Sequence, residues 1–153
     1  MNGVLVIGYG NPLRSDDGVG WHAAGRLVGD PRLDGAEVIT CQQLTPELAA
    51  DVARASLVVL IDASVHRGGP GSVAVRRIQP RGDPPPLAWS HHLDPAALAG
   101  LASALYEATP PMVVVSVAGA SLAPGDRLSP ILQRALPGVV ETVAGVVREH
   151  RHA

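Results

Sequence analysis

The chain has 153 residues, of which 46% are hydrophobic, and this length and composition suit a single domain with a continuous core. Its 14 acidic residues nearly balance its 12 basic residues, so the sequence carries no electrostatic footprint for nucleic acid or for an anionic membrane surface. All of the basic residues are arginine. The absence of lysine excludes a P-loop lysine and a Schiff-base lysine.

The lone cysteine, Cys41, cannot form an internal disulfide, and the N-terminal residues run directly into an apolar segment. No apolar run approaches the roughly 20 residues that a membrane-spanning helix needs. We therefore expect a cytoplasmic protein that does not insert into a membrane.

Five apolar or alternating segments predict β-strands, at residues 4–7, 36–40, 57–61, 72–78 and 112–117. The third segment has no polar residue before Asp62, which indicates a central strand covered on both faces. The fourth alternates in polarity and indicates a peripheral strand.

Capping residues and apolar stripes predict four helices among these strands. Their expected starts are, in chain order, Ser15 or Asp16, Thr45-Pro46, Asp94-Pro95 and Ser129-Pro130. The third helix is expected to present Leu98, Leu101 and Leu105 on one face, and Pro137 is expected to kink the fourth. The order of elements predicts an α/β fold, a three-layer sandwich in which a twisted, mostly parallel sheet of about five strands lies between helices, with residues 1–153 as one domain.

Three residues could meet at the carboxyl ends of the strands, where open α/β sheets bind their ligands. Asp17 follows the first strand and its glycine turn, Asp62 follows the third strand, and His92 lies on the loop before the third helix. Two carboxylates and an imidazole form an oxygen and nitrogen set that suits Zn²⁺ or Ni²⁺ and leaves positions open for water or substrate.

The same residues also have structural interpretations. Asp16 and Asp17 could cap the helix that follows them, and His91 and His92 could be a solvated pair on a loop. Asp62 is harder to explain structurally, because a carboxylate after five apolar residues must be solvated, paired or bound to metal.

Two other kinds of site are poorly supported. The Gly8-Tyr9-Gly10 turn lacks the third glycine of a dinucleotide fingerprint, since that position is Leu13. Cys41 has no base beside it in any recognisable motif, and a free cysteine is more often a small buried hydrophobe than a nucleophile.

Three motifs together carry a resemblance to a known family. They are Gly8-x-Gly10-Asn11-x-Leu13-x-x-Asp16-Asp17-Gly18-x-Gly20, then Ile61-Asp62-Ala63, then Ser90-His91-His92. In this order and spacing they resemble the hydrogenase maturation endopeptidase family, across nearly the whole chain. The Ser-x-His pattern of that family selects His92 over His91.

The resemblance implies a phosphorylase/hydrolase-like sheet fold and a protease that removes a C-terminal extension from the immature large subunit of a nickel-iron hydrogenase. It implies that Asp17, Asp62 and His92 contact nickel already carried by the substrate, with zinc or cadmium able to substitute. These three are also the expected catalytic residues, with Asp16 or a free carboxylate oxygen as a candidate base.

One stretch departs from the family pattern. Many members carry Asp-Gly-Gly-Thr after the second strand, in a segment associated with substrate choice, whereas this chain reads Cys41-Gln42-Gln43-Leu44-Thr45. The departure leaves the partner open, and it leaves room for an alternative function, a metal-sensing or chaperone module that binds the immature subunit without cutting it.

Overall fold

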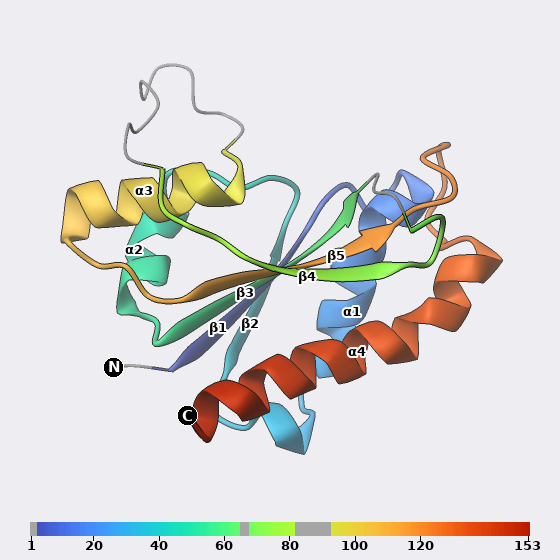
Figure 1. The fold of residues 1–153 in the computed structure, drawn as a ribbon. Coiled ribbons are helices and arrows are strands. Elements are labelled where there is room, and N and C mark those ends of the chain that lie inside the picture. The colour runs from blue at the N-terminus through green and yellow to red at the C-terminus, as the bar shows by residue number, and fades with distance from the viewer. Residues whose placement is uncertain (1–2, 65–67, 82–92) are drawn as a thin grey trace.

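The computed structural model describes residues 3–64, 68–81 and 93–153 (Figure 1). The strands in these ranges are β1 (Val4–Tyr9), β2 (Glu37–Cys41), β3 (Leu57–Ser64), β4 (Val73–Arg77) and β5 (Met112–Ala118). The α-helices are α1 (Val19–Leu27), α2 (Leu48–Arg54), α3 (Pro95–Tyr106) and α4 (Pro130–Arg151), and short 3-10 helices span Ser15–Gly18 and Pro31–Leu33. Strands and helices follow one another nearly as the sequence predicts.

The strands form one sheet in the order β2-β1-β3-β5-β4. Neighbouring strands are parallel, except that β4 runs antiparallel to β5. The position of β3 in the middle of the sheet confirms the prediction drawn from its apolar sequence. Every residue of β4 is exposed and the strand lies at one edge, so the predicted peripheral strand is also confirmed.

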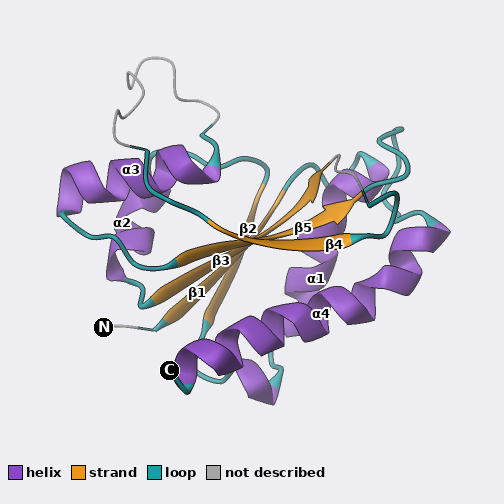
Figure 2. Ribbon diagram, viewed as in Figure 1, coloured by secondary structure: helices purple, strands orange, loops and turns teal. Residues whose placement is uncertain are grey.

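Helices cover both faces of this sheet (Figure 2). Val59 and Ile61 of β3 join the cluster that packs on α1 and α4, while Val58 and Leu60 join the cluster that packs on α2 and α3. Successive residues of a strand point to opposite faces, which is why a strand covered on both sides is apolar throughout. The predicted three-layer α/β sandwich with a mostly parallel five-stranded sheet is confirmed.

Two helix predictions were wrong in detail. The second helix begins at Leu48 without a side-chain cap, because Thr45 forms a turn in which its carbonyl accepts from the Leu48 N–H at 3.1 Å. Leu105 is 55% exposed rather than buried, since the last turn of α3 lies beyond the part that packs on the core. The fourth helix passes through Pro137 and buries its whole predicted stripe, Leu132, Leu136, Val139, Val143 and Val147.

The glycines of the first motif allow the start of α1 to approach the sheet closely. A Cβ on Gly20 would overlap the Ile61 carbonyl and would lie 2.8 Å from the Tyr9 nitrogen, and a Cβ on Gly8 would overlap the Gly20 carbonyl. Gly10 has a φ of 135°, a conformation that other residues rarely adopt. Glycine at these positions brings the two acidic residues of the motif to the carboxyl ends of β1 and β3.

None of the helices in the described ranges has the length and apolar character needed to cross a membrane.

Candidate active site

Asp62 is held by two hydroxyl groups from neighbouring strands. The Tyr9 hydroxyl, at the end of β1, donates to Asp62 Oδ2 at 2.8 Å, and the Ser116 hydroxyl, on β5, donates to Oδ1 at 3.0 Å. Asp62 and Ser116 are direct partners in the β3–β5 register. The sheet therefore fixes both the position and the orientation of this carboxylate.

The surroundings of Asp62 disfavour the ionised form of its carboxyl group. Burial raises the pKa of the Asp62 carboxyl above its ordinary value, and hydrogen bonds from Tyr9 and Ser116 and the charge of Arg76 offset this only in part. The negative charge of Asp17 raises that pKa further, which shows that the two carboxylates lie within electrostatic range of each other. A cation beside them would relieve both effects.

The pKa of the Tyr9 hydroxyl is raised by burial and by the charge of Asp62, so Tyr9 stays protonated and remains a donor.

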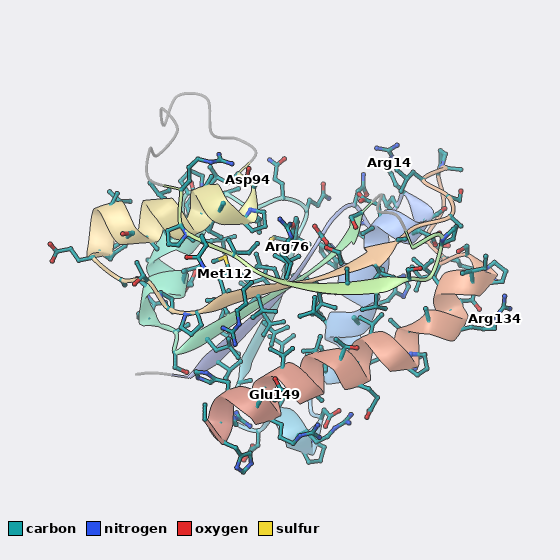
Figure 3. The ribbon with its side chains drawn as sticks, in the orientation of Figure 1. Arg14, Arg76, Asp94, Met112, Arg134 and Glu149 are labelled. Carbon is teal, nitrogen blue, oxygen red and sulfur yellow. The ribbon has the colours of Figure 1, made fainter. Side chains whose placement is uncertain are left out.

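Arg76 provides positive charge on the same side of the sheet as Asp62. Figure 3 shows Arg76 on β4 beneath the start of α3, where Asp94 caps the helix by accepting from the Ala97 N–H at 2.8 Å.

Asp17 lies in the 3-10 helix that precedes α1. Its Oδ2 accepts from the Asn11 N–H at 2.7 Å, and the described residues provide no hydrogen bond to its Oδ1. No side chain caps α1, so the capping role that the sequence allowed for Asp17 was wrong. Asp17 instead closes the glycine turn with one of its oxygens.

Asp16 points away from this site and is fully buried. Its Oδ2 accepts from the N–H groups of Ala120 and Ser121 and from the Ser129 hydroxyl, and its Oδ1 accepts from the Ser129 N–H, at 2.7 to 3.0 Å. Burial alone would raise the pKa of Asp16, but these hydrogen bonds bring it below its ordinary value. Asp16 therefore fastens the segment between β5 and α4, and neither of its oxygens is left over for a base.

His91 and His92 lie outside the described residues. Leu93, which follows His92, is buried and donates its N–H to the carbonyl of Leu44 at 3.2 Å, just beyond the carboxyl end of β2. Among the described residues no group of three or more histidine, cysteine or acidic side chains could hold a metal. Of the three predicted ligands, Asp17 and Asp62 lie in the described part of the chain, near enough to each other for the charge of Asp17 to raise the pKa of the Asp62 carboxyl.

A cleft of about 460 Å³ opens beside Asp17. It lies between the end of β3 and the segment that follows β5, and its lining consists of Asp17, Ala63, Ser64, Gly119, Ala120, Ser121 and Leu122. Asp17 belongs to the lining of this cleft, whereas Asp62 does not.

Cys41 is half-buried, and burial raises the pKa of its thiol, as expected for an unreactive cysteine.

Tyr9 and Ser116, which hold Asp62, were not predicted from the sequence. Ser116 carried a usable signal, because it is the one polar residue in the apolar β5 segment.

Nearly the whole chain superimposes on solved hydrogenase maturation endopeptidases. The endopeptidase HybD from Escherichia coli is 27% identical, and the match covers 97% of this chain and 93% of that one with a TM-score of 0.74. The chain belongs to the hydrogenase maturation endopeptidase family. The predicted membership and the predicted peptidase class are thereby confirmed.

Further solved structures share the fold of this endopeptidase. An Escherichia coli endopeptidase studied in solution is 25% identical over 97% of this chain and 93% of that one, with a TM-score of 0.75. The maturation protease HycI from Thermococcus kodakarensis KOD1 is 19% identical over 96% of this chain and 93% of that one, with a TM-score of 0.73. No family model and no curated protein matches the chain.

Proposed function

We propose that this endopeptidase removes a C-terminal extension from the immature large subunit of a nickel-iron hydrogenase after nickel has been inserted. The observation that carries the proposal is the partly buried Asp62 carboxylate, oriented by two hydroxyl groups and lying within electrostatic range of Asp17. Relatives named as hydrogenase maturation endopeptidases support the choice of substrate. We place the reaction in the cytoplasm, in keeping with a chain whose single cysteine leaves no internal disulfide.

The donor set fits nickel delivered by the substrate. Asp17 and Asp62 supply carboxylate oxygens, and we propose His92 as the nitrogen ligand that completes the set. Hydrogen bonds from Tyr9 and Ser116 to Asp62 are the kind of outer contact that orients a metal-binding carboxylate. Zinc or cadmium would suit the same donors.

Binding the metal of the substrate would convert recognition into catalysis. The tether would hold the scissile peptide beside the two carboxylates, and positioning of this kind lowers the barrier by making the reaction effectively intramolecular. The ion would polarise the peptide carbonyl or lower the pKa of an attacking water. A carboxylate oxygen of Asp17 or Asp62 is the candidate base, since all the contacts of Asp16 are structural.

The test is to incubate the protein with its nickel-loaded immature large subunit and to measure the mass of the product. Cleavage lowers the mass of the large subunit by that of the extension. A metal-sensing or chaperone module would bind the subunit and leave its mass unchanged, which would overturn the proposal.

Three substitutions test the site residue by residue. We expect Asp17→Ala, Asp62→Ala and His92→Ala each to abolish cleavage while the protein stays folded, and we expect the exposed Asp126→Ala to cleave as the wild type does. Full activity in one of the three variants would remove that residue from the site.

A further inference from the structure

We propose that the cleft beside Asp17 binds the substrate side chain next to the scissile peptide and selects an uncharged, apolar residue there. The inference rests on the proposed function and adds a specificity site to it. The cleft is formed by the end of β3 and by the segment after β5, and Asp17 belongs both to its lining and to the proposed metal site. A peptide held at the carboxylates would therefore have its neighbouring residue at the mouth of this cleft.

The size of the cleft fits part of a peptide. Its volume of about 460 Å³ lies within the range of about 300 to 1,000 Å³ that is typical of ligand-binding sites. The residues around it are small, since Ala63, Gly119 and Ala120 leave the space open and Leu122 adds an exposed apolar side chain. An apolar substrate side chain would fill the space and lose its contact with water.

The charged and polar groups of the lining also affect which substrate side chain the cleft can bind. Asp17 is the only ionisable residue among the described residues that line the cleft, and it would be occupied by the metal of the substrate. An acidic substrate side chain would lose its hydration in the cleft without gaining an ion pair from these lining residues. The Ser64 hydroxyl is buried at one side of the cleft and has no hydrogen-bond partner in the described part of the chain. Buried polar groups normally have a partner, and the backbone of a bound peptide would supply one after a small shift of this residue.

One wall of the cleft is fixed in place before any substrate binds. Asp16 accepts hydrogen bonds from the N–H groups of Ala120 at 2.7 Å and Ser121 at 3.0 Å, and it holds Ser129 by two further hydrogen bonds. A wall that is ordered in advance discriminates by shape, because binding does not have to order it. The cleft should therefore be sensitive to a single added side chain.

The experiment compares cleavage rates for nickel-loaded large subunits in which each residue flanking the cut is changed in turn to Gly, Leu, Trp or Asp. At one of the two positions we expect the wild type to cleave the Leu substrate at least about tenfold faster than the Asp substrate. Ala120→Leu narrows the cleft and should lower the ratio of the Leu rate to the Gly rate by about tenfold. Leu122→Ala widens the cleft and should raise the ratio of the Trp rate to the Leu rate.

Ala104→Leu is the matched control, since Ala104 is exposed on α3 and does not line the cleft, and it should leave the rate ratios as they are. If Ala120→Leu fails to fold, the result with Leu122→Ala decides, because Leu122 is 44% exposed and its truncation costs little core packing. Cleavage by the wild type with ratios that neither variant changes would overturn this inference alone. Failure of the wild type to cleave any substrate would overturn the proposed function together with it.

Discussion

The Tyr9 hydroxyl donates a 2.8 Å hydrogen bond to Asp62 Oδ2 and so links the end of β1 to the carboxylate at the end of β3. Tyr9→Phe removes this donor and keeps the ring. We expect the affinity of the protein for Zn²⁺, and its rate of cleavage, to fall by about tenfold or more, because outer contacts of this kind typically contribute 10 to 100-fold to metal affinity. Calorimetric titration with Zn²⁺ and a cleavage assay would measure the two effects.

Tyr106 offers a matched control for this substitution. It is the other tyrosine of the chain, it is 51% exposed at the end of α3, and it lies far along the chain from β1. Tyr106→Phe should leave both the affinity and the rate as in the wild type. Equal effects of the two substitutions would show that the Tyr9 hydroxyl does not orient Asp62.

Arg76 should control the pH at which the site loses its activity. Metal binding requires ionised Asp62, whose pKa is raised, so activity should fall as the pH falls through that raised value. The positive charge of Arg76 lowers the pKa of Asp62, and Arg76→Gln should therefore move the acid limb of the pH profile to higher pH. The profile of cleavage rate against pH measures the shift.

Arg77 provides the comparison, because it follows Arg76 on β4 and faces the opposite side of the sheet, where it lies near Val146 and His150 of α4. Arg77→Gln should leave the acid limb in place. An unchanged profile in Arg76→Gln would mean that its guanidinium does not act on Asp62.

Asp16 should act on stability rather than directly on chemistry. In Asp16→Asn, an NH2 group replaces one of the two oxygens that accept hydrogen bonds from Ala120 and Ser129, so a buried N–H donor is left without an acceptor. We expect the free energy of unfolding to fall by about 3 kcal/mol, as when one partner of a buried, hydrogen-bonded charge is removed. The pKa of Asp16 is lowered in the folded protein, so its contribution is present above the pKa of the unfolded chain and disappears as the pH falls through the folded value.

Urea unfolding at several acidic pH values would test both expectations for Asp16. The stability of Asp16→Asn should depend less on pH in this range than that of the wild type. Asp126→Asn, at an exposed position in the same segment of the chain, should resemble the wild type, and equal losses in the two variants would contradict the role given to Asp16.

Two glycines of α1 should respond in opposite ways to alanine. A Cβ at Gly20 would overlap the Ile61 carbonyl, so Gly20→Ala should destabilise the fold by more than about 2 kcal/mol. Gly25 lies in the same helix with no atom within 4 Å of its added Cβ, and Gly25→Ala should stabilise by about 0.5 to 1 kcal/mol. Thermal unfolding midpoints would show whether each substitution raises or lowers the stability. An unchanged midpoint in Gly20→Ala would show that the fold does not depend on the close approach of α1 to β3.

The strands and Asp62 could be predicted because their signals are local. An apolar run that ends in a carboxylate identifies both the central strand and a residue that needs a partner. The partners themselves depend on strand order, and nothing near Tyr9 or Ser116 in the sequence states that β1 and β5 flank β3. Asp16 was misjudged for the same reason, because its hydrogen-bond donors lie more than 100 residues further along the chain.

Metal-dependent recognition is tested by the mass of the large subunit after incubation with the wild-type protein. The nickel-loaded subunit and the nickel-free subunit are compared. We expect the wild-type protein to remove the extension from the nickel-loaded subunit alone, and we expect Asp62→Ala to remove it from neither subunit. Cleavage of nickel-free subunit at the same rate would contradict the claim that Asp17 and Asp62 recognise the metal of the substrate.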